Sequence, residues 1–579
     1  MKRKLKQLLC FMMSVLIIVP SAMLNAGAQA PLSLLVAADC HYSPLSMLGP
    51  IGEENGLPGD PLYWYTNIQG ELTYESDAIM TELLSRFEAS ASNFLLIAGD
   101  LSDNGLRGEH TALADKFKQF EKRTGKSIFI INGNHDVSSI SDSNYINLAE
   151  FKSIYADFGY NEALASDKNS ASYTAELANG YRLLAIDSCI YGEDGGQISA
   201  DLLKWIKTQI AATKADGKKL VGMMHHSLLA HFKIQGIVGD TVKDYRKLSA
   251  LFADSGIKVV FTGHKHANDI TAAVSANGNR IYDIETTSLV NYPNSYRNIT
   301  FSDSAVKVET SNIDKLNISE LAPGYNQAQL DLIKTDFHAY SYGYFQAGMC
   351  RYINEYVGTP RKVAGWLKIE KDSAAYNALS LAMPVFGKAL ALPIYDKAGT
   401  PAIDSVEEIA KSVGEKIAPS SYTRFSDLIA FLVTRLFSGD ENTPYDSPEV
   451  QLFLQTLKAG LVYAFVNIPN DAARELFKSL GLSGTGLIVN DASYTRAAKL
   501  IFAKTASEKI LSAVIKPLIE GITVDAFAPG DLNVTLEAYG VSGGATASAD
   551  PITDFQVITD IIKSMFNLFV NVMKAATVF

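Results

Sequence analysis

The amino-acid sequence predicts an α/β domain followed by a mainly α-helical domain. Two patterns indicate this: short apolar runs alternate with amphipathic segments up to about residue 312, and beyond it helical spacing continues almost alone. In addition, a chain of 579 residues exceeds what one hydrophobic core usually organises. We therefore expect an α/β domain over residues 31–312 and a helical domain of unknown role over residues 313–579.

Residues 1–28 are predicted to be a secretory signal peptide. A basic segment, MKRKLKQ, precedes the apolar run LLCFMMSVLIIV, and small residues then offer cleavage sites after Ala28 or Ala30. Cleavage after Ala28 is favoured because Pro31 would directly follow a cut at Ala30. The alternative is an uncleaved membrane anchor, although Pro20 interrupts the run. The sequence thus predicts a secreted, extracytoplasmic protein.

Six brief, continuous apolar runs in the first domain are predicted to be buried strands. They are residues 32–39, 93–100, 127–133, 181–188, 219–226 and 257–264. Between them, residues 76–90, 109–123 and 198–213 space their apolar side chains three and four apart, as amphipathic helices do. This order of strands and helices predicts α/β layering.

Nearly every predicted strand ends in a side chain that can bind a metal ion. These residues are Asp39, His41, Asp100, Asn134, His135, His225, His264 and His266. In open α/β sheets, ligands bind outside the carboxyl ends of the strands, so these side chains should converge. Imidazoles, carboxylates and an amide oxygen without thiolates suit Zn, Mn or Fe, and the set is too large for one ion. A single Asp or His at a strand end is more often a turn residue, but the size of the set favours a metal site.

Backbone features support this interpretation. In an extended segment, Asp39 and His41 would point to the same side and Cys40 to the other. Gly99, Gly133 and Gly263 each directly precede a candidate ligand, where glycine allows tight turns and close backbone approach.

Five motifs in this order, DCH, GDLSDNG, GNHD, MHH and GHKH, resemble those of the calcineurin-like metallophosphoesterases. The resemblance covers about residues 32–310 and implies a four-layer sandwich of two β-sheets flanked by helices, with a dinuclear metal site at one edge. It implies that one divalent ion is held by Asp39, His41 and His266, and the other by Asn134, His225 and His264. Asp100 would bridge the two ions.

The resemblance also implies roles in catalysis. His135 would lie beside the scissile phosphate and protonate the leaving group, and Asp103 would orient His135 and favour its charged form. Asp103 could instead be a helix or turn cap. His226 competes with His225 as a ligand, and the resemblance favours the first histidine of the pair.

Three further histidines are expected to have no part in the reaction. His231 should be a loop or surface residue, and His110 and His338 should be bystanders.

The predicted activity is hydrolysis of small phosphate mono- or diesters by a metal-bridged hydroxide that attacks phosphorus in line. A net charge of -11 argues against general nucleic-acid binding. The alternative is a non-catalytic extracellular binding or adhesion protein that uses the helical domain and keeps a relic phosphoesterase fold. The apparently complete ligand set argues against it. Protein partners are not predicted.

Three segments outside the motifs also carry expectations. The loop after the first strand contains Tyr63, Trp64 and Tyr65, which could stack on a substrate or pack the loop onto the protein. Helical spacing appears over residues 337–357, 448–466, 471–482 and 492–522, and residues 531–539 could be extended. The final helical segment, residues 555–579, contains Asp560, Lys563 and Lys574 and is a poor membrane span.

Overall fold

The computed structural model describes most of the first domain and part of the second. The described residues are 31–48, 69–140, 142–232, 235, 241–361, 364, 369–396, 405–412, 416–439, 441–469, 472, 516–525 and 530–540. The predicted signal peptide over residues 1–28, the aromatic residues Tyr63, Trp64 and Tyr65, and the final segment over residues 555–579 lie outside them.

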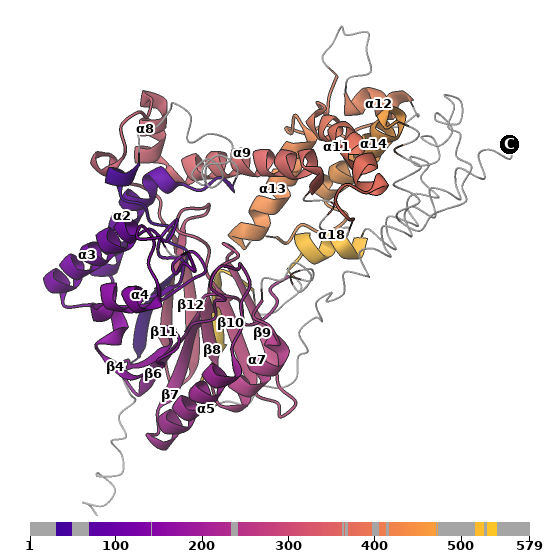
Figure 1. The fold of residues 1–579 in the computed structure, drawn as a ribbon. Coiled ribbons are helices and arrows are strands. Elements are labelled where there is room, and N and C mark those ends of the chain that lie inside the picture. The colour runs from indigo at the N-terminus through magenta and orange to yellow at the C-terminus, as the bar shows by residue number, and fades with distance from the viewer. Residues whose placement is uncertain are drawn as a thin grey trace, which may run out of the picture.

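Two β-sheets form the centre of the molecule (Figure 1). The first has the order β13 (Asn533–Glu537), β12 (Ala305–Asn312), β11 (Ser295–Phe301), β1 (Leu32–Ala37), β2 (Phe94–Ala98) and β3 (Ser127–Ile131). The second has the order β4 (Ala163–Ser166), β5 (Tyr173–Glu176), β6 (Tyr181–Ile186), β7 (Lys219–Met224), β8 (Val259–Thr262), β10 (Arg280–Glu285) and β9 (Asp269–Val274). The sheets are packed against each other through contacts of β2 with β7 and of β3 with β6.

The centre of each sheet is parallel. Strands β1, β2 and β3 run parallel, with Leu34 opposite Phe94 and Leu95 opposite Ile128. Strands β6, β7, β8 and β10 are also parallel, and the outer strands are antiparallel. All six strands predicted from apolar runs are confirmed. Their carboxyl ends bring the polar residues that follow them to one edge.

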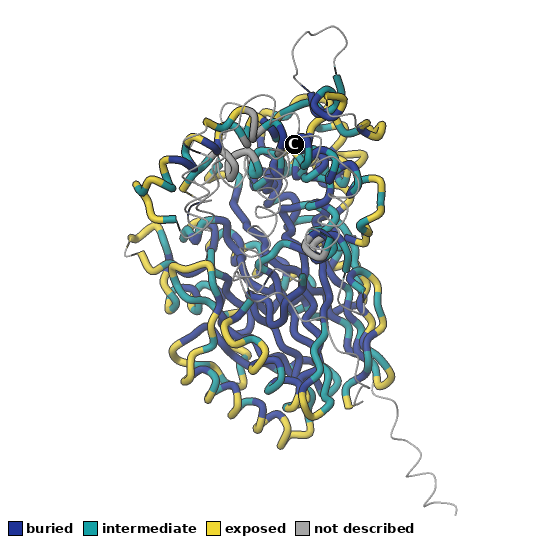
Figure 2. Tube along the Cα trace, turned by 90° about the vertical axis from the view of Figure 1, so that its right-hand side faces the viewer, coloured by how far each residue is buried: buried dark blue, intermediate teal, exposed yellow. Residues whose placement is uncertain are grey.

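Helices cover the outer faces of both sheets, which gives four layers. Helices α2 (Ser76–Ala89), α3 (Arg107–Thr124) and α4 (Leu148–Ile154) lie on the side of the first sheet, and α5 (Ala200–Ala215) and α7 (Tyr245–Asp254) on the side of the second. Leu35, Ile97 and Phe129 belong to the larger hydrophobic core, which includes the space between the sheets. Ile206 and Phe252 belong to a second core beneath α5 and α7. Figure 2 shows the sheets as mainly buried and the outer turns as exposed. The predicted four-layer architecture is confirmed.

The second half of the chain is mainly helical. Its described helices are α8 (Gln327–Thr335), α9 (Phe337–Gly358), α11 (Ala374–Ala391), α12 (Val406–Ser412), α13 (Phe425–Ser438), α14 (Pro448–Asn467) and α18 (Lys516–Thr523). Helices α9 and α14 confirm two of the predicted segments, whereas residues 471–482, apart from Ala472, and most of 492–522 lie outside the described part. Among the described residues, no helix has the length and apolar character that a membrane span requires.

Strand β13 and helix α9 both connect the helical part to the rest of the chain. Strand β13 pairs antiparallel with β12, with Leu536 opposite Val306, so the segment predicted to be extended is a strand of the first sheet. Helix α9 passes over the edge where the strands end (Figure 1), and the Tyr340 hydroxyl donates to Glu75 Oε1 at 2.7 Å. The division of the chain into two domains near residue 312 stays a prediction. Strand β13 comes from beyond this position in the sequence and yet lies in the first sheet.

Candidate metal centre

The predicted ligands meet at the shared edge of the two sheets. Asp39 and His41 follow β1, Asp100 follows β2, and Asn134 and His135 follow β3 in the first sheet. From the second sheet, His225 follows β7, and His264 and His266 follow β8. Both sheets therefore contribute to the site.

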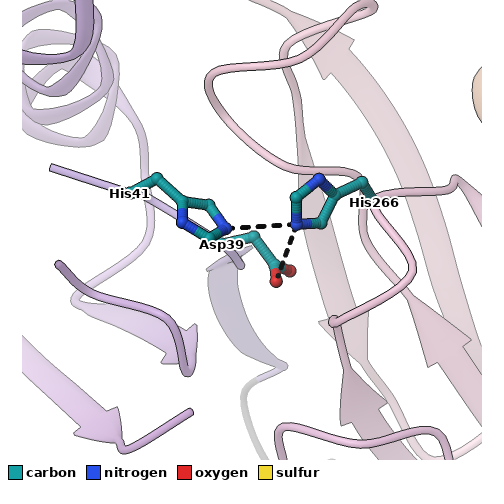
Figure 3. A group of neighbouring side chains, drawn as sticks. All are labelled: Asp39, His41 and His266. Carbon is teal, nitrogen blue, oxygen red and sulfur yellow. Dashed lines mark hydrogen bonds and ion pairs between the residues drawn. The ribbon is translucent and has the colours of Figure 1, made fainter. Parts of the chain in front are cut away.

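The first group of donors consists of Asp39, His41 and His266 (Figure 3). His266 Nδ1 donates to Asn291 Oδ1 at 2.8 Å, so Nε2 is the ring nitrogen that faces the other two donors. That Nε2 lies 3.4 Å from Asp39 Oδ1 and 3.1 Å from His41 Nε2. Burial lowers the pKa of His41 well below its ordinary value, which favours the neutral imidazole that binds metals. This donor set fits a divalent ion.

The second group consists of Asn134, His225 and His264. His225 Nδ1 donates to the Ala98 carbonyl at 3.0 Å, so its Nε2 faces Asn134 Oδ1 at 2.9 Å. His264 offers a ring nitrogen within 4.8 Å of the donor atoms of His225 and Asp100. A backbone hydrogen bond of this kind fixes the tautomer and orientation of a metal-binding histidine.

Asp100 lies between the two groups. Its Oδ2 is 3.1 Å from His225 Nε2 and 3.8 Å from His41 Nε2. Burial opposes ionisation, but the facing histidines, His225 foremost, hold the pKa of Asp100 well below its ordinary value. An ionised carboxylate in this position can bridge two cations.

The backbone turns sharply at five of the seven predicted ligands. Positive φ angles occur at Asp39 (49°), His41 (37°), Asp100 (44°), His264 (76°) and His266 (57°). Such angles are uncommon outside glycine and cluster at functional sites. Asp39 and His41 do reach the same donor group, but the expectation that they alternate along an extended segment was wrong.

Glycines make room for the ligand carboxylates. A Cβ atom on Gly133 would lie 2.0 Å from Asp100 Oδ1, and one on Gly263 would lie 2.2 Å from Asp39 Oδ2. A Cβ on Gly99 would lie 2.6 Å from His225 Nδ1. The predicted close approach of the backbone at these three positions is confirmed.

Residues 32–268 match the family model described as calcineurin-like phosphoesterase. This part of the chain belongs to the calcineurin-like phosphoesterase family. A cAMP/cGMP dual specificity phosphodiesterase from Mycobacterium tuberculosis is 21% identical over 194 residues, which are 33% of this chain and 55% of that protein. A probable cyclic nucleotide phosphodiesterase from Rhodococcus erythropolis is 24% identical over 202 residues, 34% of this chain and 60% of that protein. The chain thus spans less than two thirds of the length of either relative.

Among solved structures, a dimetal phosphatase from Danio rerio aligns with 48% of this chain and 96% of its own. The identity is 12% and the TM-score 0.37.

His135 of the calcineurin-like part is held beside both donor groups. Its Nδ1 donates to the Asp103 carbonyl oxygen at 2.8 Å, and its ring centroid lies 4.8 Å from that of His41. Burial opposes a positive charge on His135, but the Asp100 carboxylate and the Asp103 carbonyl raise its pKa above the ordinary value. The side chain can therefore carry a proton next to the metal ligands.

The structure refines the role predicted for Asp103. Its main-chain carbonyl, not its carboxylate, accepts the hydrogen bond that orients His135. The carboxylate Oδ1 instead lies 3.8 Å from His41 Nδ1, and Oδ2 accepts from the Asn104 amide. Burial and the nearby Glu109 raise the pKa of Asp103 to about 8, and the Asp103 charge is in turn one of the causes that raise the pKa of His135.

The other histidines of the first domain are engaged elsewhere. His226 uses Nδ1 toward Ser188 Oγ at 2.8 Å and Nε2 toward the Asp194 carbonyl at 3.0 Å, which supports His225 as the ligand. His231 lies in a loop, as one of the two expected alternatives had it, but it is buried and ion-paired with Asp269 at 2.8 Å, so it is not a surface residue.

His110 and His338 lie outside both donor groups. His110 is buried and hydrogen-bonds to the Asp136 carbonyl and the Tyr155 hydroxyl, at 3.0 Å each. His338 contacts the Tyr292 hydroxyl at 3.0 Å.

Two residues near the centre gave no usable sequence signal. Asn291 orients His266 from beyond β10, and Glu71 is fully buried within 4.8 Å of donor atoms of His41 and Asp103. Neither belongs to one of the five motifs. Only a pattern of buried polar residues around the site, which one sequence does not reveal, could have indicated them.

Proposed function

We propose that this protein is a secreted, metal-dependent phosphoesterase whose preferred substrates are phosphodiesters of the cyclic-nucleotide class. The observation that carries the proposal is the meeting of two complete donor groups around Asp100. A donor set of histidines and oxygens in two adjacent groups suits two Zn, Mn or Fe ions.

The metal ligands and His135 would have different roles in the reaction. Asp39, His41 and His266 would hold one ion, and Asn134, His225 and His264 the other, with Asp100 between them. When bound, the two ions would supply positive charge for the phosphoryl oxygens and for a nucleophilic hydroxide. His135, held at Nδ1 by the Asp103 carbonyl, would give a proton to the departing oxygen.

The substrate class rests on the two curated relatives, whose names refer to cyclic nucleotide phosphodiesterases. Phosphate monoesters are the competing substrates. A non-catalytic protein with a relic fold is a poorer explanation, because strained backbone at five ligand positions would have no use in it.

Secretion rests on the composition of residues 1–28 alone. Expression of the full chain, followed by N-terminal sequencing of the exported form, tests it. We expect an N-terminus at Gln29; full-length chain retained inside the cell would contradict secretion.

The activity is tested by comparing cyclic AMP, an aryl phosphodiester and an aryl phosphomonoester as substrates in the presence of Mn²⁺. We expect the diesters to be hydrolysed faster, and Asn134→Ala to lower the rate at least about 100-fold through loss of a ligand. Asn169→Ala, at an exposed position away from the centre, is the control. Bound metal without hydrolysis of any ester would refute the proposal.

A further inference from the structure

Three carboxylates from distant parts of the chain meet where the helical part joins the sheets. Glu441 follows α13, Asp525 follows α18, and Asp531 precedes β13. One oxygen from each carboxylate lies within 4.8 Å of the other two. Figure 1 shows α13 and α18 approaching the sheets from the helical part. This cluster is separate from the candidate metal centre.

Hydrogen bonds outside the cluster fix the segments that carry it. The Ile270 N–H donates to Asp531 Oδ1 at 3.1 Å, which ties this carboxylate to β9. The Thr443 N–H donates to the Thr523 carbonyl at 2.6 Å, so the segments after α13 and α18 lie side by side. The carboxylates are thus held together by the fold.

The cluster is buried and has an unsatisfied atom. Glu441 is 3% exposed and Asp531 6% exposed. Glu441 Oε2 has no hydrogen-bond partner within the part of the chain that the structure describes. Burying a carboxylate oxygen without a hydrogen-bond partner costs folding free energy, so a proton or a cation at this place would stabilise the fold.

Negative charge exceeds positive charge around the cluster. Asp269, Glu441, Asp525 and Asp531 act on one another here, and Asp283 and Glu285 act together with Asp269 around His231. Among the described residues, the cations beside them are His231, paired with Asp269 and Asp283, and Arg297, which donates to the Asp531 carbonyl. Among the described residues, the carboxylates around the cluster therefore outnumber the cations.

A proton on the carboxylates is the alternative to a metal ion. Burial and the neighbouring Asp269 raise the pKa of Glu441 to about 10 and that of Asp531 to about 8. Protons would neutralise the groups but would not join three segments. An ion with oxygen ligands would do both, and Ca²⁺ accepts several carboxylates in flexible geometry, with water and main-chain carbonyls completing its shell.

We propose that Glu441, Asp525 and Asp531 bind one Ca²⁺ ion that fastens the helical part of the chain to the two sheets. The ion would contact the segments after α13, after α18 and before β13 together. Because only the folded chain brings these segments together, Ca²⁺ should stabilise the folded state.

The test is thermal unfolding and calorimetric Ca²⁺ titration of the full chain after chelator treatment. At about a hundredfold excess over the dissociation constant, Ca²⁺ should raise the midpoint of unfolding by several degrees. Glu441→Gln and Asp531→Asn should each weaken Ca²⁺ binding at least tenfold. Asp446→Asn, in the same loop as Glu441 but exposed, should not.

The result expected from an Asn134→Ala chain separates this site from the candidate metal centre. Its Ca²⁺ response should match that of the wild-type chain even if it no longer hydrolyses phosphate esters. An unchanged midpoint of the wild-type chain with Ca²⁺, or an equal rise in Glu441→Gln, would overturn the proposal. The proposal would also be overturned if Glu441→Gln stabilised the calcium-free chain and the wild-type chain gave no calorimetric Ca²⁺ signal. The Glu441 carboxyl would then be a neutral group of the core.

Discussion

At the scale of single residues, the candidate metal centre depends on backbone positions that tolerate only glycine. Gly133 packs against Asp100, and Gly263 packs against Asp39. A Cβ atom on either glycine would overlap the neighbouring carboxylate. The metal ligands are therefore positioned as much by their neighbours as by their own side chains.

Gly133→Ala should disrupt the centre without removing any ligand. The new Cβ atom would lie 2.0 Å from Asp100 Oδ1 and 2.3 Å from its backbone nitrogen, so the bridging carboxylate must move. We expect lower metal content and an activity loss of about 100-fold or more, because small displacements of reacting groups have effects of this size. Gly195→Ala, whose Cβ would meet nothing within 4 Å, is the control. Equal activity of the two variants would contradict this geometry.

His135→Asn should separate proton transfer from metal binding. If His135 protonates the leaving group, kcat should fall by about 10²- to 10⁴-fold while the metal content stays unchanged. Metal analysis and kinetics on the same preparation check this. A simultaneous loss of metal would instead make His135 a ligand, which its position near His41 and Asp100 allows geometrically.

The position of a residue could be predicted from the sequence where its side chain follows a strand. Asp39, Asp100 and His225 could be named because apolar runs end just before them. Two features depend on contacts between residues far apart in the chain. They are the choice of the Asp103 carbonyl as the partner of His135, and the burial of His231. Local patterns do not contain that information.

At the scale of elements, helix α9 links the helical part to the candidate metal centre. Gly348 of α9 packs on Gly70, one residue before the buried Glu71, and Tyr340 hydrogen-bonds to Glu75. The helix therefore fixes the segment that leads into α2.

Two glycines of α9 should respond to alanine in opposite directions. A Cβ on Gly348 would lie 2.4 Å from Gly70 Cα, so Gly348→Ala should destabilise the fold by about 1–3 kcal/mol. A Cβ on Gly343 would meet nothing within 4 Å, so Gly343→Ala should stabilise it by about 0.5–1 kcal/mol through helix propensity. Denaturant unfolding measures both, and the same sign for both variants would refute this packing of α9.

Elements could be predicted from the sequence where their periodicity was strong. The strands β1, β2 and β3 and the helices α2, α3 and α5 appear where apolar spacing placed them. Strand β4 was missed because its four residues alternate between half-buried and exposed positions without an apolar run.

At the scale of the whole molecule, the helical part and the sheets are joined at β13 and at the cluster of Glu441, Asp525 and Asp531. The pairing of β13 with β12 joins residues more than 200 positions apart. A sequence pattern can indicate that residues 531–539 are extended, but it cannot indicate their partner strand.

This junction should make the stability of the calcium-free protein depend on pH. The folded pKa of Glu441, about 10, lies above the ordinary value of about 4.3, so the folded chain keeps a proton that the unfolded chain releases. The contribution to stability is complete below about pH 4.3 and is lost as the pH rises toward 10. The charged groups facing Glu441 are Asp269, Asp525 and Asp531, and Arg297 lies beside Asp531.

Denaturant unfolding at about pH 6 and pH 9 with chelator present checks this dependence. The wild-type chain should lose more stability between the two values than Glu441→Gln, which has no proton to release. Parallel losses would show that Glu441 keeps an ordinary pKa.

We propose that two metal ions at the shared edge of the sheets make this chain a phosphoesterase. The most direct measurement titrates metal-free protein with Mn²⁺ and follows bound metal and cyclic AMP hydrolysis together. We predict that the chain binds about two ions and that hydrolysis rises as they bind. An Asp39→Asn, His225→Ala double variant should not bind these ions. Full activity in the metal-free chain, or two bound ions without hydrolysis of any phosphate ester, would contradict it.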